Sequence, residues 1–189
     1  MYVATVLSKA ARELIWLAEI IRTGNESLKI PYARRTRNDL LNAGHYFDQA
    51  LKSLQGNPSV SSPKDVARVC QKLLETELAL SMKMPSGNHH ERRQHADRAL
   101  EYGEAALDNA VKINNQIMVV QIQFLLAALN IWRVNIQAKA SGIEPRLAPG
   151  RDFALAKIQT ILREIHTIES LDYAGYEEQA RYYEKWLNR

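Results

Sequence analysis

The sequence predicts an all-α protein in which consecutive helices run antiparallel. Three observations predict this fold class. Glycine and proline fall almost entirely between long stretches of helical periodicity, and those stretches are rich in the helix formers Ala, Leu, Glu, Gln, Lys and Arg. No segment alternates apolar and polar residues between hairpin turns, so we expect no sheet. Long helices joined by short connections must lie antiparallel to their neighbours.

Turn residues divide the chain into seven predicted helices. Their ranges are 3–22, 31–55, 63–84, 89–112, 115–140, 149–170 and 176–188. Gly24 and Pro31 separate the first helix from the second, and Gly56 ends the second. Ser62 before Pro63 predicts a capping serine and a first-turn proline at the start of the third.

The later helices have similar signals at their ends. Asn88 and Glu91 have the spacing of a capping box at the start of 89–112. Gly142 is placed to end 115–140 as a C-terminal glycine, and Gly175 precedes the last helix.

Composition and charge limit the classes of protein. The 189 residues are 46% hydrophobic, enough for a single folded domain, and the charge of 25 − 21 = +4 does not demand nucleic acid or an anionic membrane as partner. Cys70 is the only cysteine, which excludes an intrachain disulfide and a zinc ribbon. Lys9, Arg12, Glu13 and Glu19 argue against a signal peptide or spanning helix near the N-terminus. We expect a cytoplasmic protein with no membrane contact, and a nuclear location also fits.

Apolar and small residues recur at a fixed step. In the second helix of each pair, Ala43, Tyr46, Ala50 and Leu51 recur 56 residues later as Ala99, Tyr102, Ala106 and Leu107, and after 55 more as Ala154, Lys157, Ile161 and Leu162. The same offsets align the first helices through Ala11, Ala67 and Ile122, through Leu14, Cys70 and Leu125, and through Ala18, Leu74 and Leu129. We therefore predict one domain, 1–189, of three helix pairs at about 1–56, 57–112 and 113–170, with a capping helix at 176–188.

These units resemble those of the tetratricopeptide-like helical repeat superfamily, which pairs two helices around small and aromatic positions such as Tyr102-Gly103-x-x-Ala106-Leu107. The units are longer than the roughly 34 residues usual there, and the proline that closes each second helix is not regularly present. The resemblance implies a right-handed superhelical stack and a non-enzymatic scaffold that binds another protein in a groove lined by the first helices.

The same offsets align polar residues on the first helices. Arg12 aligns with Arg68 and Gln123, and Glu19 aligns with Glu75 and Asn130. The helix at 115–140 extends this stripe at intervals of seven through Gln116, Gln123, Asn130 and Gln137. Carboxamides both donate and accept hydrogen bonds, and arginines hold carboxylates, so these eight residues are candidates for binding a peptide or helix. The alternative is that they form the solvated face of amphipathic helices.

Arginines near the starts of the second helices are a candidate anion site. They are Arg34, Arg35 and Arg37, then Arg92 and Arg93, then Arg146 and Arg151, and we select Arg34, Arg37, Arg92 and Arg93. Cations oppose the macrodipole at a helix N-terminus, which indicates a compensating role such as holding phosphate or nucleic acid. Ordinary surface pairs with Asp39, Glu91 and Asp152 are the favoured explanation.

Other candidate chemistry is sparse. His90 and His95 are five residues apart, which turns them away from a common metal, so we predict no metal and no cofactor. No phosphate loop or hydrolase motif is present, which favours a binding protein over an enzyme built in the bundle core. Cys70 falls in an apolar column and is interpreted as a buried hydrophobe.

The C-terminal aromatics are expected to cap the stack. Tyr176, Ala180, Tyr183 and Leu187 share one helical face that would seal the last pair. Tyr182 and Trp186 are also candidates for a homodimer interface, because the end of a stack is where a second copy can dock.

Overall fold

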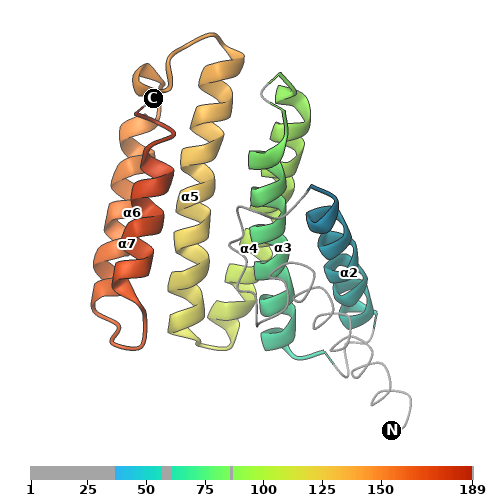
Figure 1. Ribbon diagram of the computed structural model, residues 1–189. Helices are drawn as coiled ribbons and strands as arrows, with labels where there is room; N and C mark the ends of the chain where they lie inside the picture. The colour runs from blue at the N-terminus through green and yellow to red at the C-terminus, as the bar shows by residue number, and fades with distance from the viewer. Residues whose placement is uncertain (1–36, 57–60, 86, 189) are drawn as a thin grey trace, which may run out of the picture.

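A computed structural model describes residues 37–56, 61–85 and 87–188, and every regular element in them is helical (Figure 1). The elements are α2 (Arg37–Gln55), α3 (Pro63–Lys83), α4 (His89–Lys112), α5 (Gln116–Ala140), the 3-10 turn η3 (Pro145–Leu147), α6 (Arg151–His166) and α7 (Tyr173–Glu184). This confirms the all-α prediction. The helix predicted at 3–22 lies outside the described residues.

Each helix packs against the next one in the chain, as short connections require. α5 also contacts α3 on one side and α7 on the other. α3, α5 and α7 thus form one row, with α4 and α6 packed against it (Figure 1).

Side-chain caps fix several helix starts. The predicted caps are confirmed, since Ser62 accepts a hydrogen bond from the Asp65 amide and Asn88 accepts one from the Glu91 amide. α7 begins at Tyr173, three residues earlier than predicted, because the Asp172 side chain caps it by accepting from the Gly175 amide.

Gly142 ends α5 in the way the sequence predicts. Its φ of +68° is left-handed, which glycine adopts without strain. The Gly142 amide donates to the Lys139 carbonyl, and the Ile143 amide donates to the Ala138 carbonyl at 2.9 Å. These two bonds satisfy carbonyls that the helix leaves open.

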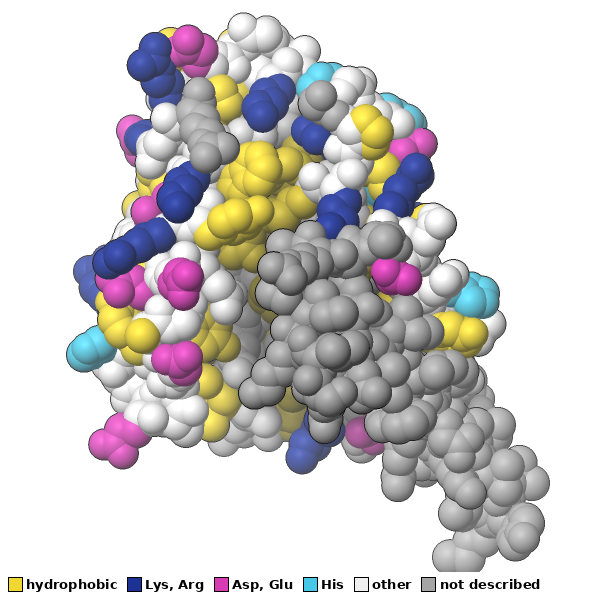
Figure 2. Space-filling model, viewed as in Figure 1, with side chains coloured by type: hydrophobic (Ala, Val, Ile, Leu, Met, Phe, Trp, Pro, Cys, Tyr) yellow, Lys and Arg dark blue, Asp and Glu magenta, His cyan; other side chains and the backbone are white. Residues whose placement is uncertain are grey.

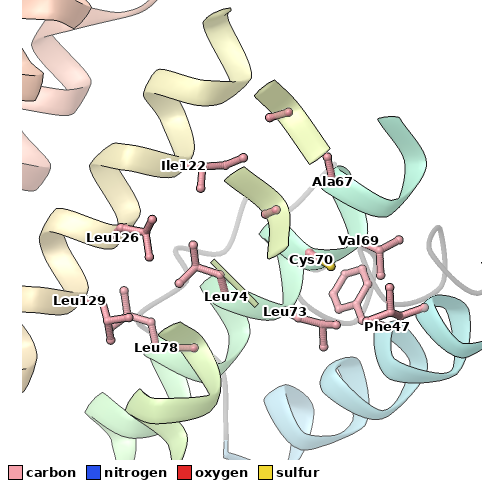
Figure 3. Close-up of a cluster of buried hydrophobic side chains, with 14 of the residues drawn as sticks. Phe47, Ala67, Val69, Cys70, Leu73, Leu74, Leu78, Ile122, Leu126 and Leu129 are labelled. Carbon is pink, nitrogen blue, oxygen red and sulfur yellow. The ribbon is translucent and has the colours of Figure 1, made fainter. Parts of the chain in front are cut away.

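Two hydrophobic clusters meet at α5. The first joins α2, α3, α4 and α5 around side chains such as Phe47, Leu74 and Leu129 (Figure 3). The second joins α5, α6 and α7 around Phe124 and Ile158. α5 is long and apolar enough to span a membrane by composition, but 56% of its apolar window is buried between its neighbours, as in the core helix of a folded domain.

The matched small positions of the second helices share the same burial. Ala43, Ala99 and Ala154 are all buried, each at most 1% exposed. Gly103 on α4 marks a close approach, since a Cβ there would lie 2.5 Å from a methyl carbon of Leu126 on α5. Small residues at these places let the helix backbones come together.

Trp132 on α5 joins four segments through one buried group, here called the Trp132 cluster. Its indole N–H donates to Ser81 Oγ of α3 at 2.7 Å, and Ser81 Oγ donates to the Arg92 carbonyl of α4 at 2.7 Å. The Arg92 guanidinium lies 5.6 Å from the Trp132 ring and donates to the Met84 carbonyl. Trp186, after α7, packs edge-on against Trp132 at 4.8 Å.

We expect Ser81→Ala to lower the free energy of unfolding by about 1–3 kcal/mol, because it leaves the Trp132 indole N–H buried without its acceptor. Urea unfolding followed by circular dichroism measures the change. Ser170→Ala, at an exposed position, is the control and should stay within about 0.5 kcal/mol of the parent. Equal stability of the two variants would contradict a structural role for this hydrogen bond.

Candidate functional site

An open groove of about 1270 Å³ runs over the row of α3, α5 and α7. Its apolar lining comes from all three helices and comprises Leu78, Ala79, Met82, Met118, Phe124, Leu125, Tyr176, Tyr182, Tyr183 and Trp186. Figure 2 shows hydrophobic side chains gathered in the upper part of this face, with Lys and Arg side chains around them. The groove is therefore a mixed surface with an apolar floor and charged edges.

The α3 wall carries most of the charge. Its polar residues in the groove are Lys64, Arg68, Gln71, Lys72, Glu75 and Lys83. Lys72 Nζ lies 3.2 Å from both carboxylate oxygens of Glu75, three residues further along the helix. From Lys64 to Lys83 the wall follows nearly the whole of α3, about 29 Å at 1.5 Å per residue.

The α7 wall is aromatic. Tyr176 packs edge-on against Phe124 of α5 with ring centres 4.9 Å apart, and Tyr182 packs in the same way against Trp186 at 6.1 Å. Burial raises the pKa of Tyr183 to about 12, with Tyr182 and Glu75 adding to the rise. Tyr183, which packs against both hydrophobic clusters, is the buried member of this wall.

The structure brings only part of the predicted peptide-binding set together. Arg68 and Glu75 line the groove as expected, while Arg12 and Glu19 lie outside the described residues. The predicted stripe on α5, Gln116, Gln123, Asn130 and Gln137, does not belong to the groove lining; Gln121 and Leu125 take that place. Gln123 is two residues from Gln121 and so points about 200° away around the helix.

The groove lining contains Arg68 and Gln121 but not Gln123, the residue that the step of 55 aligns with Arg68. Buried apolar residues lie on several sides of α5, and Ile122 matches an apolar residue of α3 both at a step of 55 (Ala67) and at a step of 53 (Val69). The apolar columns therefore could not fix the rotation of α5.

The groove contains three carboxamides that sequence reasoning missed. They are Gln71 on α3, Gln121 on α5 and Gln179 on α7. Burial raises the pKa of Tyr176, and a hydrogen bond with Gln121 opposes that rise. Gln121 lies two residues from the predicted Gln123, and Gln179 lies on the helix that was expected to cap the stack or to form a homodimer interface.

The predicted anion site at the arginine rim is described in part. Arg92 is 7% exposed, and its guanidinium donates to the Met84 carbonyl and lies against the Trp132 ring, so it faces the interior of the bundle. Burial also lowers its pKa. Arg37 pairs with Glu91 at 3.4 Å, Arg93 is exposed, and Arg34 lies outside the described residues.

The C-terminal residues have two roles. Ala180 and Leu187 are buried in the second cluster, as the capping prediction requires. Tyr182 is half exposed and Trp186 is partly buried against Trp132, and both line the groove. The two candidate interface residues therefore face the same surface as Arg68.

A smaller cavity of about 320 Å³ lies between α2, α3 and α4 beside a buried polar cluster. His95 Nδ1 lies 2.6 Å from Glu77 Oε2 and 2.7 Å from a guanidinium nitrogen of Arg98. Nδ1 can donate to the carboxylate or accept from the guanidinium, but one tautomer cannot do both. Arg98 also pairs directly with Glu77 at 3.3 Å, so these three residues satisfy one another. Within the described part of the chain, no three His, Cys, Asp or Glu side chains are placed to hold a metal.

Cys70 lies in the core of the first cluster and is 1% exposed (Figure 3). Burial raises the pKa of its thiol from 9.0 to about 11. A thiol that keeps its proton and is closed to solvent is a poor nucleophile, in agreement with its interpretation as a packing residue.

We expect stability to fall as the pH rises from 9 to 10, with Cys70 contributing about 1 kcal/mol of that fall. The unfolded thiol loses its proton near the ordinary cysteine value of 9.0, whereas the folded thiol keeps it to a pKa of about 11. Stability from this group is thus complete below pH 9 and lost as the pH rises towards 11. Urea unfolding at pH 8, 9 and 10 should show a steeper decline for the parent chain than for Cys70→Ala. Parallel declines would contradict the burial of the thiol.

No known protein family, curated protein or solved structure significantly matches the chain.

Proposed function

We propose that the protein is a non-enzymatic protein-interaction module that holds a helix or peptide segment of a partner in the groove over α3, α5 and α7. The observation that carries this proposal is the groove itself, about 1270 Å³ in volume and lined along nearly all of α3. Apolar grooves of this length are a recurrent way of binding amphipathic helices.

The lining suits a polypeptide ligand. Met82, Leu125 and Tyr182 present apolar surface from three different helices, so a bound segment would contact all three at once. Gln71, Gln121 and Gln179 offer hydrogen-bond donors and acceptors at several points along the same surface. Aromatic side chains at the centre of an interface commonly supply much of the binding energy.

The resemblance to tetratricopeptide-like repeats supports the same proposal. In the predicted three-pair organisation, α3 and α5 are the first helices of the second and third pairs, the helices on which such a stack binds its ligand. α7 takes the next place in the row and contributes an aromatic wall. A right-handed superhelical relation between the pairs remains part of the proposal.

Substitutions inside and outside the groove test this function. We expect Tyr182→Ala and Leu125→Gln each to reduce capture of the partner at least tenfold, equivalent to about 1.4 kcal/mol. Gln137→Ala, at an exposed position outside the groove lining, is the matched control and should capture as the parent does. Quantitative mass spectrometry of proteins captured from source-cell extract measures the effect, with thermal unfolding as the check on folding.

Only proteins that are lost with both groove variants and retained with Gln137→Ala support the proposal. A captured set that is unchanged by the groove variants, or lost only with Gln137→Ala, would place the binding surface elsewhere. Loss in proportion to a fall in thermal midpoint would assign Tyr182 and Leu125 to the fold.

A further inference from the structure

The charge in the groove is divided unequally between its walls. All four cations, Lys64, Arg68, Lys72 and Lys83, lie on α3. The two carboxylates are Glu75 on α3 and Glu178 on α7. One wall is therefore basic, while the opposite wall is mainly aromatic.

The basic residues form a row on the first half of α3. Lys64, Arg68 and Lys72 are spaced by four residues, which places them on one side of the helix over about 12 Å. Lys72 is balanced by Glu75 at 3.2 Å. Lys64 and Arg68 are exposed, and within the described part of the chain no ion pair involves either of them. The excess positive charge is thus concentrated where the groove begins.

We propose that the groove selects an acidic amphipathic helix of about 20 residues. Its apolar residues, repeating at intervals of three and four, pack on Met82, Leu125 and Tyr182. Its Asp or Glu residues, on the edge of that stripe, pair with Lys64 and Arg68. This inference rests on the proposed function and names the chemistry of the partner. Complementary charge of this kind speeds encounter and fixes the orientation of a bound helix.

The same features disfavour two other anionic ligands. A phosphate backbone carries no aliphatic side chains to pack on Met82 and Leu125 in the apolar floor. The apolar floor is recessed between two helical walls, whereas a membrane surface requires apolar side chains that project. A polypeptide that carries both apolar and acidic side chains satisfies the floor and the basic wall together.

Three synthetic 20-residue helical peptides test the inference against the full chain by fluorescence anisotropy. The first has a Leu and Trp stripe edged by Glu, the second replaces each Glu with Gln, and the third replaces each Glu with Lys. We expect the Glu peptide to bind about fivefold to tenfold more tightly than the Gln peptide, and the Lys peptide to bind most weakly. Added salt should reduce the difference between the peptides.

A double variant locates the effect. Lys64→Gln with Arg68→Gln should make the Glu and Gln peptides bind equally. The control removes two exposed cations outside the groove lining, Arg93→Gln with Lys157→Gln, and should leave the preference unchanged at the same net charge. Tyr182→Ala should weaken binding of the Glu peptide.

The outcomes separate this inference from the proposed function. Equal binding of the three peptides, each weakened by Tyr182→Ala, would overturn the acidic preference and leave the groove as a binding site. If neither Tyr182→Ala nor the double variant changes binding of the Glu peptide, the inference and the proposed function are both overturned. No binding of the Glu peptide would overturn the inference, while the capture experiment decides the function independently. The inference would also be overturned if the double variant lost binding to anionic vesicles or to single-stranded DNA while its binding of the Glu peptide was unchanged.

Discussion

α5 is apolar on almost every side, and the positions of the other helices follow from the need to cover it. Its most apolar stretch of 18 residues has a mean hydropathy of 1.7, that of a segment that water cannot surround at low cost. α3 and α4 cover one side and α6 and α7 cover the other, which is why the two hydrophobic clusters meet on this helix. Between α3 and α7, Leu125 and Met118 remain in the floor of the groove. The proposed binding surface therefore includes a part of α5 that its neighbours leave uncovered.

The Trp132 cluster connects the stability of the fold to the shape of the groove. Ser81 and Arg92 give the buried indole its polar and cationic partners, and Trp186 rests on its outer edge. Because Trp186 also lines the groove, the aromatic wall is held in place from inside the bundle. In the same cluster the Arg92 guanidinium is buried and donates to the Met84 carbonyl.

Local signals in the sequence predicted the bounds of the described helices well, but the rotation of one helix relative to another was predicted poorly. Ser62, Asn88 and Gly142 act through contacts within a few residues, so their roles could be derived from neighbouring sequence. Arg68 could be assigned to a polar face because α3 is amphipathic. The side of α5 that faces the groove could not be predicted, because apolar residues lie on several sides of this helix. Gln121 and Gln123 are only two residues apart but point to different sides of it. The burial of Arg92 depends on Trp132, 40 residues away, and no local pattern contains that information.

Positions 121 and 123 also provide the most direct measurement. They lie two residues apart on α5, one lining the groove and the other turned away from it. A photo-crosslinking amino acid is placed at each position in turn in the full chain. Source cells that contain each variant are irradiated, and the crosslinked products are compared by mass spectrometry. We expect position 121 to crosslink a partner protein and position 123 to give none or far less of that product. A partner crosslinked mainly from position 123, or equally from both, would contradict the groove as the binding surface.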